Sequence, residues 1–166
     1  MTLLYRETGL IAAAGVLAAD QAVKLGLLYG AGFAHLPPGQ SVPVLPFFNL
    51  VMVWNPGISY GLLPASGPWG MAALITMSLV AIAGLSYWLW HATDHFLAIG
   101  LGFIIGGAVG NNLIDRVLYG RVADFFHFYA FGYDWYVFNV ADVAIVLGAV
   151  AMLYEVIKPA PQTRQD

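Results

Sequence analysis

Two aspartates, Asp124 and Asp142, stand at the ends of one aromatic-rich stretch, DFFHFYAFGYDWYVFNVAD. Each borders strongly apolar sequence, where an ionised carboxylate is costly unless a partner compensates its charge. Two carboxylates held close together do not both ionise easily, so one of them stays protonated. The charged one can then take a proton from water while the neutral one donates to a carbonyl oxygen, which is acid–base hydrolysis of a peptide bond. The pair is a candidate catalytic dyad.

The same two aspartates are also compatible with structural or transport roles. Asn139 fits the N-cap of a helix, and Asp142 would then occupy the third helical position, where the helix dipole favours a negative charge. Asp124 would be an interfacial loop residue. Acidic residues inside membranes also serve transport, so spacing alone does not decide between hydrolysis, proton relay and structure.

Two more charged pairs lie in apolar surroundings. Asp20 and Lys24 are four residues apart and would share one helix face, as an ion pair or with the lysine reaching the membrane interface. Asp115 and Arg116 are adjacent, and they would form a structural pair or hold a phospholipid headgroup or a substrate backbone.

Two formal motifs do not predict sites. GISYG (57–61) matches a nucleophile-elbow pattern, but Pro64 follows closely, no helical pattern begins there and no partner residues are evident. His91 and His95 have the spacing of helical metal ligands, but the segment lacks the glutamate of H-E-x-x-H and suits a surface connection. We therefore expect neither a catalytic serine at the first motif nor a metal at the second.

The composition indicates an integral membrane protein. Hydrophobic residues make up 60% of the 166 residues and charged residues 9%, whereas soluble domains carry roughly 25% charged residues. The net charge of −3 gives no basic surface for nucleic acid. Cysteine is absent, which excludes disulfides, thiolate nucleophiles and Cys-ligated metals.

Four apolar segments have the length that a bilayer requires, about 20 helical residues. The stretch at about 30–68 differs, because it is rich in proline and β-forming residues and contains no Lys or Arg, which favours a position outside the cytoplasm. The sequence therefore predicts a mainly α membrane protein, with four transmembrane helices and a small extracytoplasmic β-rich element between helices 1 and 2. The expected helices span about 9–29, 69–90, 96–115 and 137–157 of a single domain, 1–158, and a disordered cytoplasmic tail covers 159–166.

This topology, with both termini in the cytoplasm, brings the polar residues together at the outer side of the membrane. The residues that converge there are Asp20, Asn112, Asp115, Arg116, Asp124 and Asp142. Glycines at 102, 106 and 110 repeat every four residues, which predicts close helix packing in the third span.

Four ordered blocks carry a family resemblance. DQAVK (20–24), NPGISYG (55–61), GGAVGNNLIDRVLYGRVADF (106–125) and FNVADVAI (138–145) resemble the lipoprotein signal peptidase family, signal peptidase II, in order and spacing. The resemblance implies an aspartic endopeptidase of the bacterial inner membrane with its active site near the extracytoplasmic face. It also implies that the reaction requires no metal and no other cofactor. Its expected substrates are diacylglyceryl-modified prolipoproteins, cut just before the lipidated cysteine. Membrane phospholipids are the other expected partners, and a monomer is expected.

The resemblance also assigns roles to residues of this chain. Asp124 and Asp142 match the catalytic aspartates. The expected substrate-binding or site-organising residues are Asp20, Lys24, Asn55, Gly57, Asn112, Asp115, Arg116 and Asn139. The family usually reads G-N-L-x-D-R, whereas this chain has GNNLIDR, one residue longer. The extra residue leaves open whether Asn111 or Asn112 faces the site.

Two rival functions would use the same residues differently. A small transporter or proton channel would use the acids as a relay, but it predicts an internal repeat or polar residues through the bilayer depth, and neither is evident. A non-catalytic membrane scaffold would tolerate the loss of either Asp124 or Asp142.

Overall fold

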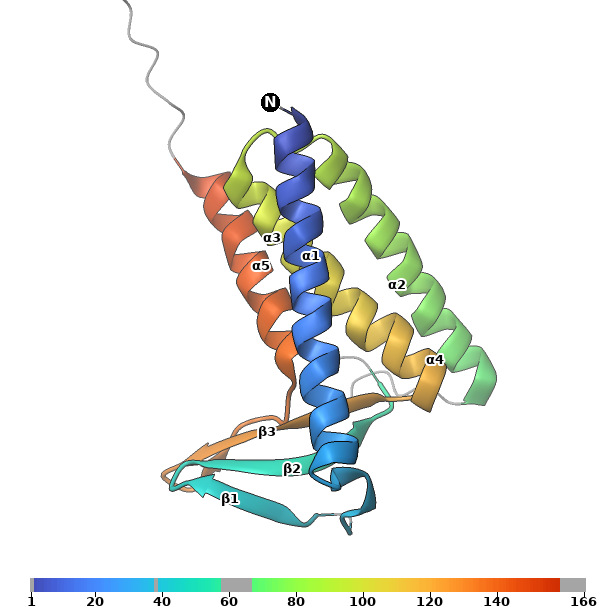
Figure 1. Cartoon of the computed structure of the whole chain (residues 1–166), viewed down its shortest axis with the longest axis vertical. Helices are drawn as coiled ribbons and strands as arrows, with labels where there is room; N and C mark the ends of the chain where they lie inside the picture. The colour runs from blue at the N-terminus through green and yellow to red at the C-terminus, as the bar shows by residue number, and fades with distance from the viewer. Residues whose placement is uncertain (1, 38, 58–66, 159–166) are drawn as a thin grey trace, which may run out of the picture.

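The structure is a computed structural model that describes residues 2–37, 39–57 and 67–158. Within these residues, long helices lie side by side and a small sheet lies across one end of the bundle (Figure 1). The elements are α1 (Thr2–Leu25), η1 (Gly26–Gly30), η2 (Phe33–His35), β1 (Ser41–Leu45), β2 (Phe48–Asn55), α2 (Gly67–Trp90), α3 (His95–Ala108), η4 (Val109–Asp115), α4 (Arg116–Tyr119), β3 (Val122–Ala130), β4 (Tyr133–Asp134) and α5 (Val140–Ile157). Residues 58–61 of the GISYG motif and the predicted tail lie outside the described residues.

Three helical stretches of the described chain are long and apolar enough to cross a membrane: Leu3–Gly30, Gly67–Trp90 and His95–Tyr119. They overlap the first three apolar segments of the sequence, and the 18-residue helix α5 covers the fourth. Helix α1 begins at Thr2, well before the apolar run that starts near Gly9. In this first part of the helix, Arg6 Nε donates to the Trp90 carbonyl oxygen at 2.9 Å, which ties the start of α1 to the end of α2.

Helix α3 is the central helix, with α1 packed along one side and α5 along another. The predicted close packing of its glycines is confirmed. A methyl group at Gly102 would overlap the Gly9 carbonyl oxygen, and one at Gly106 would overlap that of Ala13. At Gly110 it would lie 2.7 Å from an Asp20 carboxylate oxygen. The glycines therefore let α1 approach the central helix backbone to backbone.

The sheet is antiparallel, in the order β1-β2-β3-β4. The segment at 30–68 supplies β1 and β2, which pair as an antiparallel hairpin, so the β structure predicted there is present. The sheet is larger than the β-rich element expected between the first two helices, because β3 and β4 come from residues after α4 and β3 pairs along β2. Asp124 consequently lies in a strand and not in a loop.

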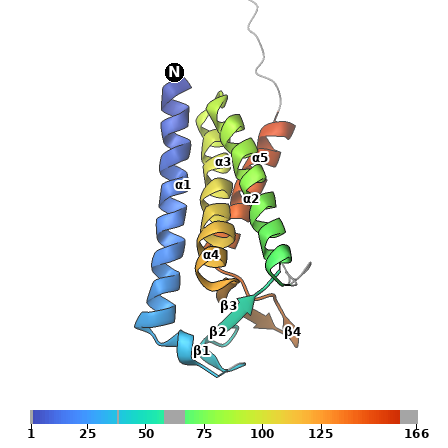
Figure 2. The ribbon, with the colours of Figure 1, turned by 90° about the vertical axis from the view of Figure 1, so that its right-hand side faces the viewer.

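The start of α1 and the end of α5 lie at the same end of the bundle, and the sheet lies at the opposite end (Figures 1 and 2). Buried apolar residues join the sheet to the bundle: Leu28 and Phe33 pack with Ala123 and Phe125 of β3. This packing fixes β3 beneath the helices.

Candidate active site

Asp124 is buried, with 3% of its surface exposed, on the inner part of β3. Strand register places Asp124 opposite Val53 of β2 and Val122 opposite Asn55. Because side chains alternate along a strand, Asn55 and Asp124 share one face of the sheet. The Asn55 amide nitrogen donates to Asp124 Oδ2 at 3.3 Å, and its oxygen accepts from the Gly57 backbone N–H at 3.0 Å.

Asp142 is held by a capping box at the start of α5. Asn139 is the N-cap, its side-chain oxygen accepts from the Asp142 N–H at 3.0 Å, and Asp142 Oδ2 accepts from the Asn139 N–H at 3.1 Å. The predicted N-cap is thus confirmed. The same Asn139 also donates through its side chain to Asp124 Oδ1 at 2.6 Å. One asparagine therefore joins the two aspartates, so the capping geometry and a dyad are compatible.

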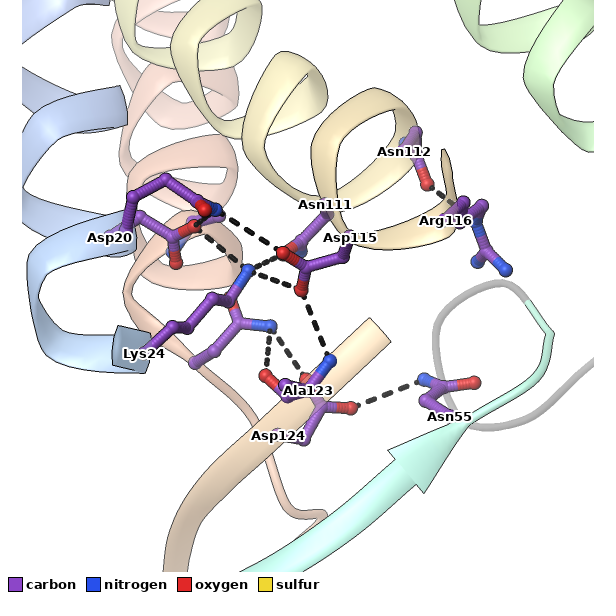
Figure 3. Close-up of polar contacts among 12 residues, drawn as sticks. Asp20, Lys24, Asn55, Asn111, Asn112, Asp115, Arg116, Ala123 and Asp124 are labelled. Atoms are coloured by element: carbon purple, nitrogen blue, oxygen red, sulfur yellow. Dashed lines mark hydrogen bonds and ion pairs between the residues drawn. The ribbon is translucent and has the colours of Figure 1, made fainter. Parts of the chain in front are cut away.

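A buried cluster of α1 and η4 residues lies beside the pair. Lys24 is 2% exposed, and its ammonium forms ion pairs of 2.8 Å with both Asp20 and Asp115 (Figure 3). The predicted Asp20–Lys24 pair is confirmed. Asp115 forms its ion pair with Lys24, on another helix. The structural pair between Asp115 and Arg116, which their adjacent positions had suggested, is therefore not the main contact of Asp115.

The carboxylates of this cluster hold the segments that carry the two aspartates. Asp115 Oδ2 accepts from the Ala123 backbone N–H at 3.1 Å, directly before Asp124. Asp20 Oδ1 accepts from the Ala141 backbone N–H at 3.0 Å, directly before Asp142. A single ion-pair cluster thus sets the position of both aspartates.

Arg116 is buried on the other side of the site. Its guanidinium donates to the carbonyl oxygens of Pro56 and Gly57, and its Nε donates to Asn112 Oδ1 at 3.2 Å. The segment that follows Asn55 is therefore tied to the end of the central helix. Asn112 orients the arginine and lies away from the lysine cluster (Figure 3).

Two polar residues of the site were not among the predicted site residues. Asn111 is buried and contacts both Lys24 and Asp142. Gln21 donates to Asp20 at 3.1 Å and to Asp115 at 3.2 Å. The doubled asparagine of GNNLIDR was the signal for Asn111, but only the helix phase decides which asparagine turns inward.

Both aspartates line one cavity of about 610 Å³. The polar residues that line it are Asn55, Asn111, Asn112, Arg116, Asp124 and Asp142. Most of the other lining residues are apolar, and they come from helices α2, α3 and α5, from β3 and from the connection that precedes α5. Residues of this apolar part include Leu85 from α2, Ile104 from α3, and Val146 and Leu147 from α5. The cavity therefore combines a polar site with a surface suited to hydrocarbon.

Electrostatics distinguish Asp124 from an ordinary carboxyl. Burial raises its pKa to about 7, from an ordinary value of 3.8, and the nearby Asp142 adds to the increase. The donors Asn55 and Asn139 and the charge of Lys24 act in the opposite direction. A carboxyl that titrates near neutral pH in a cavity is suited to acid–base chemistry.

The two histidines with metal-ligand spacing lie outside this site. His91 Nδ1 contacts the Tyr87 carbonyl oxygen at 2.8 Å, and His95 Nδ1 contacts the Thr8 hydroxyl at 3.0 Å, both at the opposite end of the bundle. Within residues 2–37, 39–57 and 67–158, no group of three or more metal-ligating side chains occurs.

Known proteins resemble this chain over nearly its full length. A family model described as signal peptidase (SPase) II matches residues 12–158. A lipoprotein signal peptidase of Rhodopseudomonas palustris (strain TIE-1) is 49% identical over 160 residues, covering 94% of this chain and 95% of that protein. One from Methylorubrum extorquens (strain PA1) is 46% identical over 156 residues, covering 94% and 89%.

Solved structures share the fold. One bacterial membrane enzyme superposes with a TM-score of 0.80 at 26% identity, covering 96% of this chain and 93% of its own. A second has a TM-score of 0.76 at 29% identity, covering 93% and 95%. The helices and the small sheet therefore form a membrane-enzyme fold.

Proposed function

Because this chain belongs to the signal peptidase II family and is therefore a protease, we propose that it removes the signal peptide from diacylglyceryl-modified prolipoproteins. It cuts the bond just before the lipidated lipobox cysteine. The observation that carries this proposal is the pair Asp124 and Asp142, joined by Asn139 and facing a cavity that is apolar along the helices. The apolar part suits a signal-peptide helix or acyl chains, and the polar end suits a peptide bond.

The two aspartates share the proton work of the reaction. One carboxylate takes a proton from water as the water oxygen bonds to the scissile carbonyl carbon, and the protonated carboxyl gives its proton to the carbonyl oxygen. The resulting gem-diol collapses when the C–N bond breaks and the nitrogen takes the proton held by the first aspartate. The second aspartate recovers a proton from a gem-diol hydroxyl. The pair ends as it began, with one proton.

The remaining predicted residues position this pair or the substrate. Asp20, Lys24 and Asp115 hold the backbone before each aspartate, through the N–H groups at 123 and 141. Asn55 and Asn139 donate to Asp124, and Arg116 with Asn112 holds the segment at Gly57 beside the cavity. Backbone carbonyls and amides of that segment would pair with the extended substrate.

The membrane placement is also part of the proposal. Residues 1–158 form one domain, α5 is the fourth span, both termini are cytoplasmic, and the sheet lies at the extracytoplasmic face of the bacterial inner membrane. Exposed apolar side chains on α2 and α5 support contact with lipid; they include Leu79, Val80, Val146, Leu147, Val150 and Leu153. The proposed unit is a monomer surrounded by phospholipids.

The decisive experiment compares cleavage of a diacylglyceryl-modified prolipoprotein by wild type, Asp124→Asn and Asp142→Asn in detergent, with a zinc chelator present. Asparagine keeps the shape and removes the acid. We expect each variant to lose at least about 1,000-fold in kcat, since both proton transfers depend on the pair. Asp134→Asn is the matched control, because Asp134 is exposed on β4.

Near-normal cleavage by either folded variant would refute the proposed catalytic dyad. The transporter and scaffold alternatives would then have to be considered again. Folding is checked by thermal unfolding in the same detergent. Loss of cleavage in the Asp134→Asn control as well would indicate that the assay reports general damage and not the loss of the acid.

A further inference from the structure

Asn111 occupies a position between the lysine cluster and the candidate dyad. Its side-chain oxygen accepts from Lys24 Nζ at 2.6 Å, and its amide nitrogen donates to Asp142 Oδ1 at 2.9 Å. An ammonium only donates hydrogen bonds, so the amide oxygen must face Lys24 and the N–H must face Asp142. The orientation of the amide is therefore fixed by its partners.

This orientation gives Asp142 a donor at each oxygen. Oδ1 accepts from Asn111 and Oδ2 accepts from the Asn139 backbone N–H at 3.1 Å. Hydrogen bonds donated to a carboxylate stabilise its charged form. At Asp124, by contrast, the donor to Oδ2 is Asn55 at the longer distance of 3.3 Å. Among the donors to the four carboxyl oxygens in the described part of the chain, Asn55 therefore makes the longest hydrogen bond, at Asp124 Oδ2. A proton on that oxygen replaces the weakest of these hydrogen bonds.

The helix geometry explains why both asparagines of GNNLIDR find partners. Residues Val109–Asp115 form a π-helix, η4, which accommodates an extra residue by widening the turn. Asn111 points toward α1 and α5, whereas the next residue, Asn112, contacts Arg116. The widened turn supplies two functional amides from consecutive positions.

We propose that Asn111 is a positioning residue that keeps Asp142 as the charged member of the pair. Asp142 is then the base that takes the proton from water, and Asp124 is the acid that donates to the carbonyl oxygen. This assignment rests on the proposed function and adds to it a residue and an order of proton transfer.

The other charged groups around Asp142 come from three parts of the fold. Lys24 and Asp20 lie on α1, Asp115 and Arg116 lie at the end of the central helix, and Asp124 lies on β3. Helix α2 contributes none, since Gly67–Trp90 contains no charged residue. Asn111 bridges Lys24 and Asp142, because its amide accepts a hydrogen bond from Lys24 and donates one to Asp142.

The test is the pH profile of kcat for wild type, Asn111→Asp and Asn111→Ser. The Asp variant keeps the shape and an acceptor for Lys24, but it replaces the donor to Asp142 with an oxygen that repels it. We expect kcat to fall about 10- to 100-fold with KM little changed, as for the loss of a hydrogen bond to a charged group. The acidic limb of the profile should move up by about one pH unit. Asn111→Ser, which keeps a smaller donor and acceptor, should fall between wild type and Asn111→Asp.

Gln40→Glu is the matched control, because it makes the same amide-to-carboxylate change at an exposed position and should leave the profile unchanged. A folded Asn111→Asp variant with the wild-type kcat and profile overturns the proposal, as does an increase in KM alone. If Asn111→Asp does not fold, Asn111→Ser and Asn111→Ala are measured instead. The proposal is overturned if both variants fold and both have the wild-type pH profile. Wild-type protein that does not cleave at all refutes the proposed function instead.

Discussion

The side chains of the site depend on one lysine that pairs with two buried carboxylates. Lys24 pairs with Asp20 and Asp115. The Ala141 N–H donates to the other oxygen of Asp20, whereas the Ala123 N–H donates to the same Asp115 oxygen that pairs with Lys24. A buried ion pair contributes little net stability compared with apolar packing, but removal of one partner leaves an uncompensated charge. The cluster therefore serves mainly to hold the backbone at Ala123 and Ala141 in position, and contributes little to stability.

Asp124 should reduce the stability of the folded protein at alkaline pH. Its folded-state pKa of about 7 lies above the ordinary value of 3.8, so the folded protein binds this proton more tightly than the unfolded chain. The associated stability is complete below about pH 4 and is lost as the pH rises through about 7. Asp124→Asn should remove this dependence and stabilise the protein at pH 8 by on the order of 2–4 kcal/mol.

Thermal unfolding in detergent between about pH 4 and pH 8 checks this prediction. The wild-type midpoint should fall across that range relative to Asp124→Asn, and the two should converge at the acidic end. If the unfolding midpoints of the two proteins depend on pH in the same way, ionisation of Asp124 does not destabilise the folded protein, and the prediction is wrong. Asp134→Asn again serves as the control, since its side chain is largely exposed.

The sequence identified the candidate dyad but not all of its surroundings. Asp124 and Asp142 stood out because acids beside apolar sequence demand a physical reason. The inward orientation of Asn111 depends on a π-helical turn, and the pairing of Asp115 with Lys24 depends on which helices are neighbours. Neither follows from local sequence, because each is decided by tertiary packing.

Among the helices, the contact between α1 and the central helix determines whether the site can assemble. Lys24 reaches Asp115 and Asn111 only because the backbones of the two helices lie close together at Gly102 and Gly106. Small residues permit this approach in membrane bundles. Activity should therefore be sensitive to the size of residues far from the dyad.

Gly106→Val should separate α1 from α3. A β-branched side chain there would overlap the backbone of Ala13, where no flexible group can move aside. Overpacking of this kind destabilises by about 1–3 kcal/mol or more, and cleavage should fall at least about 10-fold because Lys24 loses its alignment. Thermal unfolding and cleavage measured on the same preparation test both effects.

Gly84→Val provides the comparison on another helix. Apart from the adjacent residues and the neighbouring backbone of its own helix, no atom of the described chain lies within 4 Å of a methyl group placed at Gly84. This change on α2 should therefore leave stability and cleavage close to wild type. Equal losses for the two variants would mean that glycine flexibility, and not the helix contact, is what matters.

The strands illustrate what local patterns do not reveal. The hairpin β1–β2 was predictable from β-forming residues between Pro and Gly. Strand β3 was not, since its inner half, Val122 to Phe125, is buried on both faces and lacks the alternation of a half-exposed strand. Its partner β2 is far away in the sequence, and only the fold brings the two together.

Across the entire chain, exposed aromatic residues mark two levels of the bundle. At the end of α2 that lies away from the sheet, they are Tyr87, Trp88 and Trp90. Toward the sheet, they are Trp69 at the start of α2 and, between β3 and α5, Phe131, Tyr133, Trp135 and Tyr136. Tyr and Trp concentrate at the two membrane interfaces, so these levels indicate where the bilayer begins and ends.

The proposed topology can be tested directly because the chain has no cysteine. Gln40→Cys places a thiol at the sheet end, and His91→Cys places one in the exposed connection at the opposite end. In cells whose outer membrane is opened, a membrane-impermeant maleimide should label position 40 at once and position 91 only after the inner membrane is permeabilised. The physical reason is that α2, which lies between the two positions, carries them to opposite sides.

A thiol at position 158 extends the same experiment to the fourth span. Lys158 is exposed directly after α5, at the end of the bundle that holds the start of α1. If α5 crosses the bilayer, Lys158→Cys should behave as His91→Cys does and react only after permeabilisation. Labelling of position 158 from outside, with position 91 still protected, would show that α5 does not cross. If positions 91 and 158 are labelled from outside and position 40 is protected, the protein has the opposite orientation in the membrane. The sheet and both candidate catalytic aspartates would then face the cytoplasm.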